Sequence, residues 1–127
     1  MAKKNKEMVK SRVSWVNSEK SWESFLLRVK TLNLPVVVHF TATWCMPSVA
    51  MNPFFDDLAL NNPCALFLRV DMDEVLNGAK QLRVTAMPTF LMMNNGVIVD
   101  KLVGANPQEM QKTVGNFVQL NYAKEGR

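Results

Sequence analysis

The chain is poor in cysteine, since only Cys45 and Cys64 occur among its 127 residues. Two cysteines are too few for a scaffold held together by disulfides, and their spacing matches no metal-binding motif. A protein with so few cysteines more often carries them as free thiols. We therefore expect no metal site, and we expect any cysteine chemistry to involve thiols rather than structural bridges.

Long apolar runs are also absent. No stretch approaches the roughly 20 apolar residues that span a bilayer, and no apolar stretch of signal-peptide length follows the lysine-rich start. These absences predict a cytoplasmic protein without a membrane partner. The length fits one domain, and a hydrophobic share of 48% is ordinary for a globular protein with a core.

The excess of positive charge is confined to the start of the chain. Residues 1–12 hold five of the 15 lysines and arginines and one of the 11 acidic residues, which gives +4, the net charge of the whole chain. Such a tail serves either nucleic-acid or membrane contact, or solubility. No aromatic residues interleave with these lysines, and no nucleic-acid motif follows. We expect residues 1–12 to form a flexible tail without a nucleic-acid partner, and residues 13–127 to form the domain.

Strand and helix patterns alternate along the domain, which predicts an α/β fold with helices on both faces of a mixed sheet. Apolar and β-branched runs predict strands at residues 12–16, 35–40, 65–70, 88–93 and 97–103. Helical periodicity and capping residues predict four helices, which begin near Ser18, Cys45, Asp71 and Pro107.

Proline, asparagine and glycine mark the breaks between these elements. Pro53 lies inside the helix that follows Cys45 and should kink it. The tripeptide Asn94-Asn95-Gly96 is typical of a β-hairpin turn. Asn106 is expected to cap the last helix, with Pro107 in its first turn and Glu109 placed to complete a capping box.

Cys45 follows the predicted central strand and precedes a helix. The first N–H groups of a helix lack intrahelical partners, and the helix dipole adds positive potential there. Both effects favour the thiolate, which is the nucleophilic form of cysteine. Ser48 shares the helix face, so its hydroxyl is expected to donate a hydrogen bond to the thiolate, although it cannot form a disulfide. Cys45 also fits a small apolar residue buried beside a helix cap, and the residues alone leave both interpretations open.

The surrounding pattern resembles the active site of the thioredoxin family. Trp44-Cys45-Met46-Pro47-Ser48 is similar to its W-C-G-P-C motif with the second cysteine replaced. Four further features of the family have counterparts in this sequence. They are the helix kink at Pro53, the cis-proline loop at Ala86-Met87-Pro88-Thr89, the hairpin glycine Gly96 and the later glycine Gly104. The chain also resembles plant h-type thioredoxins, and its Cys-x-x-Ser pattern looks like the plant monocysteinic CXXS group. The resemblance covers about residues 13–120 and implies a thioredoxin fold with about five strands and about four helices.

The resemblance also implies roles for individual residues. Cys45 would be the nucleophile, and Ser48 and Pro88 would complete the catalytic site. A cis Pro88 would present the backbone of Met87 to an extended substrate segment by strand addition. The side chain of Trp44 equally fits a packing role. The expected substrate contacts are Trp44, Met46, Pro47 and Met87.

His39 and Arg69 are the candidate tuning residues of the site. His39 stands where the family usually has a buried aspartate, which is thought to help deprotonate the second cysteine. It is either a buried neutral imidazole with one hydrogen bond or a neighbour that tunes Cys45. Arg69 falls where the family usually has a lysine, and a close approach of its charge would hold the imidazole neutral.

Cys64 does not replace the missing second cysteine. Cys45 follows its strand, whereas Cys64 precedes a strand that should run parallel to it, so the thiols lie at opposite ends of strands. A strand of about five residues separates them by roughly 15 Å, far beyond the roughly 7 Å between Cα atoms that a disulfide spans. A mixed disulfide on Cys45 therefore waits for an external thiol.

These implications predict a monothiol thiol–disulfide oxidoreductase that reduces or isomerises protein disulfides, or removes glutathione from cysteines. Its partners would be disulfide-containing or glutathionylated proteins, and glutathione or the glutaredoxin system would release the mixed disulfide. We expect a monomer without a bound cofactor. The alternative is a binding module that captures partners as long-lived mixed disulfides. A variant engineered to trap substrates fits less well, because one designed exchange would have left the family's aspartate in the place of His39.

Overall fold

The computed structural model describes residues 11–125, so the predicted tail lies outside the described residues except for its last two positions. The described chain forms five strands and five helical segments: β1 (Val13–Val16), α2 (Glu19–Val29), β2 (Pro35–Thr41), α3 (Met46–Val49), α4 (Asn52–Asn61), β3 (Leu66–Asp71), α5 (Leu76–Gln81), β4 (Thr89–Asn94), β5 (Val97–Val103) and α6 (Pro107–Glu125). None of these described helices is both long and apolar enough to cross a membrane.

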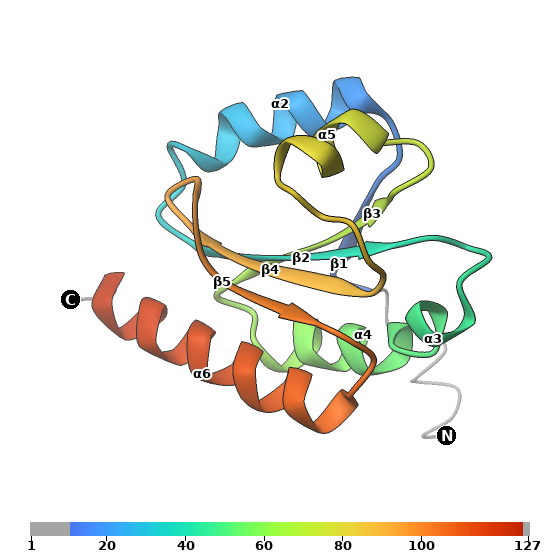
Figure 1. Cartoon of the computed structure of the whole chain (residues 1–127). Helices are drawn as coiled ribbons and strands as arrows, with labels where there is room; N and C mark the ends of the chain where they lie inside the picture. The colour runs from blue at the N-terminus through green and yellow to red at the C-terminus, as the bar shows by residue number, and fades with distance from the viewer. Residues whose placement is uncertain (1–10, 126–127) are drawn as a thin grey trace.

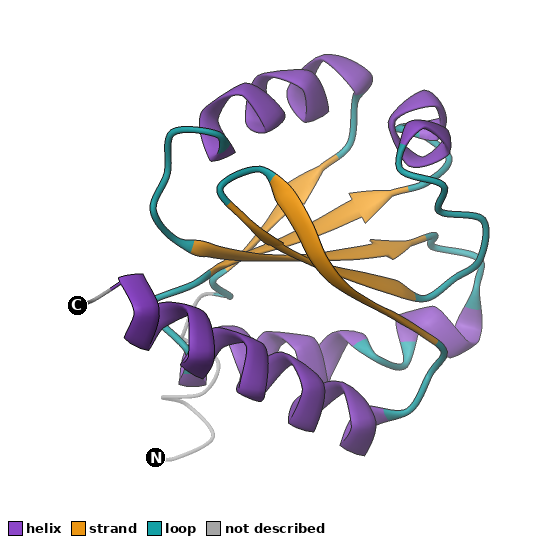
Figure 2. Cartoon of the chain, turned by 60° about the vertical axis from the view of Figure 1, so that its left-hand side comes forward, coloured by secondary structure: helices purple, strands orange, loops and turns teal. Residues whose placement is uncertain are grey.

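One mixed sheet runs through the middle of the molecule in the order β1-β3-β2-β4-β5. The strands β1, β3 and β2 are parallel, whereas β4 and β5 are antiparallel to their neighbours. The helices α2 and α5 cover one face, and α3, α4 and α6 lie on the other (Figures 1 and 2). The α/β prediction is therefore confirmed, with α3 and α4 as two parts of the helix expected after Cys45.

The central strand β2 is buried along all seven residues, and its side chains alternate between two cores. Val36, Val38 and Phe40 belong to the apolar cluster under α2 and α5. Val37 belongs to the cluster under α4 and α6. By the same alternation His39 points into this second core, where its ring contacts Phe90 of β4.

The helix after Cys45 is interrupted where Pro53 requires it. Proline has no N–H to donate to the carbonyl four residues earlier, and its ring crowds that carbonyl. The residue four positions before Pro53 is Val49, and α3 ends there. A new helix, α4, starts at Asn52 and has Pro53 in its first turn. The predicted kink is thus a short break between two helical segments.

The third predicted helix begins later than expected. Residues 72–74 form a turn instead, and the carboxylate of Asp71, the last residue of β3, accepts a hydrogen bond from the backbone N–H of Asp73. The helix α5 starts at Leu76 because Glu19 of α2 accepts hydrogen bonds from the N–H groups of Asn77 and Gly78. A carboxylate from a distant helix therefore sets this start, and local sequence signals do not reveal it.

The other local signals behave as predicted. Asn95 and Gly96 both have positive φ, 54° and 80°, as a tight hairpin turn between β4 and β5 requires. Asn106 caps α6 by accepting a hydrogen bond from the N–H of Glu109.

The first strand, β1, begins at Val13, one residue later than predicted. The guanidinium of Arg12, just before it, donates to backbone carbonyls around the end of α4.

Candidate active site

Cys45 lies at the end of the sheet, between β2 and α3. Its backbone N–H donates to the carbonyl of Ala42, and its own carbonyl accepts from the N–H of Val49. It is the N-cap residue of α3, with an extended backbone (φ −91°, ψ 96°) and a side chain that makes no capping hydrogen bond. The thiol is free and only partly buried. The residue is therefore partly open to solvent.

Ser48 faces the interior one helical turn after Cys45. Its side chain is fully buried, and its hydroxyl lies 2.5 Å from Thr41 Oγ1 and 3.2 Å from His39 Nε2. The expected hydrogen bond to Cys45 is not among those described for this hydroxyl, whose two described partners are Thr41 and His39. Thr41 was missed as a site residue, although its place two residues after His39 on one strand puts both on the same face.

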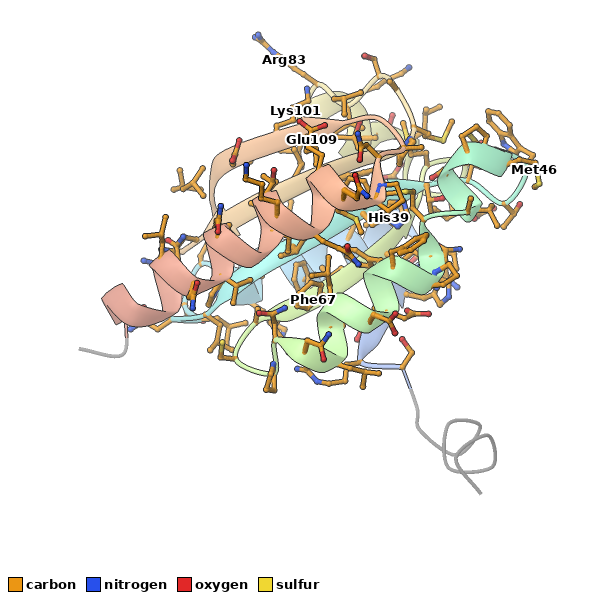
Figure 3. The ribbon with its side chains drawn as sticks, turned by 90° about the horizontal axis from the view of Figure 1, so that it is seen from below. His39, Met46, Phe67, Arg83, Lys101 and Glu109 are labelled. Carbon is orange, nitrogen blue, oxygen red and sulfur yellow. The ribbon has the colours of Figure 1, made fainter. Side chains whose placement is uncertain are left out.

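His39 is a buried neutral imidazole. It has no exposed surface, and its ring stacks on Phe90 at 4.5 Å and lies 5.2 Å from Phe55. Burial, and then the charge of Arg69, lower its pKa from 6.5 to about 3. Its Nδ1 has no described hydrogen-bond partner. The lowered pKa favours the neutral form that the sequence offered as one alternative, and Ser48 is the one described hydrogen-bond partner of the ring. Figure 3 shows His39 inside the molecule and Met46 at its outer edge.

Arg69 lies opposite His39 on the neighbouring strand β3. Its guanidinium forms an ion pair with Asp56 of α4 at 2.8 Å and lies 5.2 Å from the centre of the Trp15 ring. The side chain is 10% exposed, so the charge acts through a largely buried environment. Asp56 and Trp15 were missed by the sequence analysis, because only the packing of α4 and β1 against β3 brings them to Arg69.

The cis-proline loop lies at the same end of the sheet as Cys45. The Met87–Pro88 peptide bond is cis, as the resemblance implied. Thr89 pairs with Phe40 of β2, so Pro88 is next to the end of the strand that leads to Cys45. The carbonyl of Pro88 accepts the N–H of Gly104 at 3.1 Å. Pro88 is buried and Met87 is partly exposed.

The rim of the site is exposed and apolar. Trp44 and Met46, on either side of Cys45, are each 62% exposed, and Pro47 is exposed as well. The indole N–H of Trp44 donates to the carboxylate of Asp73 at 2.8 Å. Asp73 belongs to the turn after β3, and the sequence analysis missed its role. This hydrogen bond fixes the exposed indole next to Cys45.

Cys64 lies at the other end of the sheet. It precedes β3, whose register pairs Val36 with Leu66 and Thr41 with Asp71. Cys64 therefore adjoins the beginning of β2, and Cys45 follows its end. Both thiols are free. Within residues 11–125 no group of three or more histidine, cysteine or acidic side chains is arranged to hold a metal ion.

This fold and this site define a protein of the thiol–disulfide oxidoreductase class. The family model described as Thioredoxin matches residues 13–116, and the chain belongs to the thioredoxin family.

Within the family, the chain is similar to two curated plant proteins. It is 54% identical to the thioredoxin-like protein CXXS1 of Arabidopsis thaliana over 109 residues, which are 86% of this chain and 92% of the relative. It is 44% identical to the protein of the same name from Oryza sativa subsp. japonica, over 82% of this chain and 78% of the relative. Among solved structures, the thioredoxin NaTrxh of Nicotiana alata matches 87% of this chain and 96% of its own, with a TM-score of 0.81 and 34% identity.

Proposed function

We propose that this chain is a monothiol enzyme that exchanges disulfides through Cys45 and depends on glutathione to complete its cycle. One observation carries the proposal. Cys45 is free and partly exposed, while the position three residues later holds a fully buried serine, bonded to Thr41 and His39. A serine cannot release a mixed disulfide. The similarity to two proteins named CXXS1 supports the same conclusion.

With a glutathionylated protein as substrate, the reaction consists of two thiol–disulfide exchange steps. The Cys45 thiolate attacks the glutathione sulfur, which forms a Cys45–glutathione disulfide and releases the protein thiolate. The thiolate of a second glutathione then attacks this disulfide, regenerates the Cys45 thiolate and leaves oxidised glutathione. With a protein disulfide, a neighbouring thiolate of the substrate can expel Cys45 instead. That route isomerises the substrate without net oxidation or reduction.

An external thiol is required because the second cysteine of the chain is out of reach. Cys64 adjoins the beginning of β2, whereas Cys45 follows its end. The seven residues of β2 extend over about 23 Å at the usual rise of a strand. The cis-proline loop beside Cys45 supports substrate binding in extended form, since Met87 precedes the cis bond and is partly exposed.

The buried serine also favours a second candidate, a trap that holds partners as mixed disulfides. In that case the external thiol releases the adduct slowly, and the chain binds rather than turns over. We place either activity in the cytoplasm, in a monomer without a bound cofactor, with disulfide-containing or glutathionylated proteins as partners and glutathione or the glutaredoxin system as the source of thiol.

Turnover of a glutathionylated peptide distinguishes the two candidates. The assay couples glutathione to glutathione reductase, and a parallel assay supplies thioredoxin reductase alone. We expect turnover only with glutathione, complete loss in Cys45→Ser and an unchanged rate in the matched control Cys64→Ser. A stable Cys45 adduct that excess glutathione barely releases would establish the trap. Turnover with thioredoxin reductase alone would exclude the monothiol mechanism.

A further inference from the structure

Three buried polar side chains meet behind Cys45. The hydroxyl oxygen of Ser48 lies within hydrogen-bond distance of both Thr41 Oγ1 and His39 Nε2. The exposures of these residues are 0% for His39 and Ser48 and 2% for Thr41. Because solvent does not reach these side chains, their hydrogen-bond partners are one another and their immediate neighbours. The number of donors and acceptors therefore restricts where each proton can lie.

The imidazole of His39 limits the arrangement first. A neutral imidazole carries one N–H, and which nitrogen carries it depends on the surroundings. A proton on Nδ1 would be a buried donor without an acceptor, because Nδ1 has no described partner. Unpaired buried N–H groups are rare in native proteins, and unsatisfied acceptors are less so. The proton is therefore placed on Nε2, from where it is donated to Ser48.

The hydroxyl of Thr41 is the second restriction on how the protons are arranged. The one described partner of its hydroxyl is Ser48 Oγ, at 2.5 Å, so the Thr41 proton is satisfied only if it is donated to Ser48. A hydroxyl oxygen has two acceptor positions and one proton of its own. With Thr41 and His39 both donating, both acceptor positions of Ser48 are filled. The proton of Ser48 then needs a third group as acceptor.

The side chain of Cys45 becomes that acceptor if it rotates toward Ser48. It lies one helical turn before Ser48, where side chains are neighbours, and its sulfur has no capping hydrogen bond that would prevent rotation about χ1. We propose that Thr41 is a positioning residue: Thr41 and His39 both donate to Ser48, and the hydroxyl proton of Ser48 is thereby directed to the ionised sulfur of Cys45. The proton stays on Ser48, and no covalent bond changes. The inference rests on the proposed function only in taking Cys45 as the thiolate nucleophile.

The tautomer of His39 tests this arrangement directly. The chain contains one histidine, so the imidazole nitrogens of uniformly 15N-labelled protein give one unambiguous set of long-range proton–nitrogen correlations. We expect the pattern of a neutral ring with its proton on Nε2, in the intact wild-type chain near pH 7. A ring protonated on Nδ1 would make His39 the acceptor of the Ser48 proton and would overturn the proposal.

Variants of Thr41 supply the second test, in a Cys64→Ser background so that iodoacetamide reports on Cys45 alone. Removing the donor in Thr41→Val should lower the alkylation rate near pH 7 by about tenfold, because a hydrogen bond to a charged group is lost or weakened. Thr41→Ser keeps a hydroxyl and should restore most of the rate. An unchanged rate in Thr41→Val would overturn the positioning role.

Two features keep this test decisive. If Thr41→Val fails to fold, the histidine tautomer of the wild type and the rate of Thr41→Ser still decide the matter, since a large loss in Thr41→Ser contradicts the proposal. Neither measurement needs a disulfide substrate. A protein with the Nε2 tautomer and rapid, Thr41-dependent alkylation that nevertheless turned over no glutathionylated peptide would refute the proposed function and leave this inference intact.

Discussion

The two faces of the central strand β2 bury different kinds of side chain. The residues that face α2 and α5 are Val36, Val38 and Phe40. The residues on the face toward α4 and α6 are Val37, His39 and Thr41. The first face is apolar throughout, whereas the second becomes polar toward the end of the strand that leads to Cys45. One strand thus contributes an apolar core to one layer of the domain and the residues behind the candidate active site to the other.

We infer that the residues of the apolar face contribute mainly to the stability of the fold, and those of the polar face mainly to the arrangement of the site. On the polar face, His39 and Thr41 lie within hydrogen-bond distance of Ser48. The largely buried charge of Arg69 is compensated by its ion pair with Asp56. Each of these groups acts through a partner at a fixed position. On the apolar face, side chains contribute through buried area and close packing. Substitutions there should change the free energy of unfolding and leave disulfide exchange by the folded protein unchanged.

The largest expected effect is on the apolar face. Leu91 of β4 is fully buried in the cluster under α2 and α5. We expect Leu91→Ala to lower the free energy of unfolding by about 2–5 kcal/mol, because it removes buried methyl groups and leaves a cavity. Urea unfolding measures this loss. Leu120→Ala is the matched control, since this leucine is 71% exposed and its loss should cost within about 0.5 kcal/mol. A lower exchange rate per folded molecule in Leu91→Ala would contradict the separation.

The next effect concerns the polar face and depends on pH. The pKa of His39 is about 3 in the folded protein and 6.5 in its ordinary state. The unfolded chain therefore binds a proton as the pH falls below about 6.5, while the folded protein does not, so the contribution of His39 to stability is complete above that pH and decreases toward pH 3. The slope approaches about 1.4 kcal/mol per pH unit for one proton.

The variant His39→Phe isolates this contribution, because an aromatic ring still fits between Phe55 and Phe90 and does not titrate. The wild type should lose stability relative to the variant as the pH is lowered from about 7 to about 4, measured by urea unfolding at each pH. Carboxylates affect both proteins alike and cancel in the difference. A difference that stays constant over this range would mean that folded His39 accepts a proton as readily as the unfolded chain.

Local signals predicted most of the fold, whereas the site was predicted partly from contiguous residues and partly from the resemblance, which implied the cis peptide bond before Pro88. The hairpin at Asn95 and Gly96 and the cap at Asn106 depend on residues within a few positions of each other. The motif around Cys45 is also contiguous. The direction of the Ser48 hydroxyl and the partner of Arg69 depend instead on how α3 and α4 pack on the sheet. Pair contacts between distant segments leave no periodic pattern in one sequence.

A smaller effect is expected at Gly78, where α5 packs on α2. A Cβ atom there would lie 2.4 Å from the Trp22 ring, which is 1% exposed and has no room to move. Alanine in a helix gains about 1 kcal/mol over glycine, but overpacking costs about 1–3 kcal/mol, so we expect Gly78→Ala to be destabilising. Gly115→Ala in α6 is the matched control, because no atom of the described residues outside its own helix turn lies within 4 Å of a Cβ placed there, and only the gain in helix propensity remains. Thermal unfolding should show the two variants shifting in opposite directions.

The smallest expected change in stability is at the rim of the site. Trp44 is 62% exposed, and its indole N–H donates to Asp73. Loss of this exposed hydrogen bond in Trp44→Phe should lower the free energy of unfolding by less than about 1 kcal/mol. The same change should raise KM for a peptide disulfide with kcat retained, because the indole is no longer fixed beside Cys45. Asp73→Asn keeps an acceptor for the indole and should leave KM near the wild-type value. If Trp44→Phe lowered the free energy of unfolding by more than about 2 kcal/mol, Trp44 would have a packing role. The separation between residues that stabilise the fold and residues that serve the site would then not include the rim.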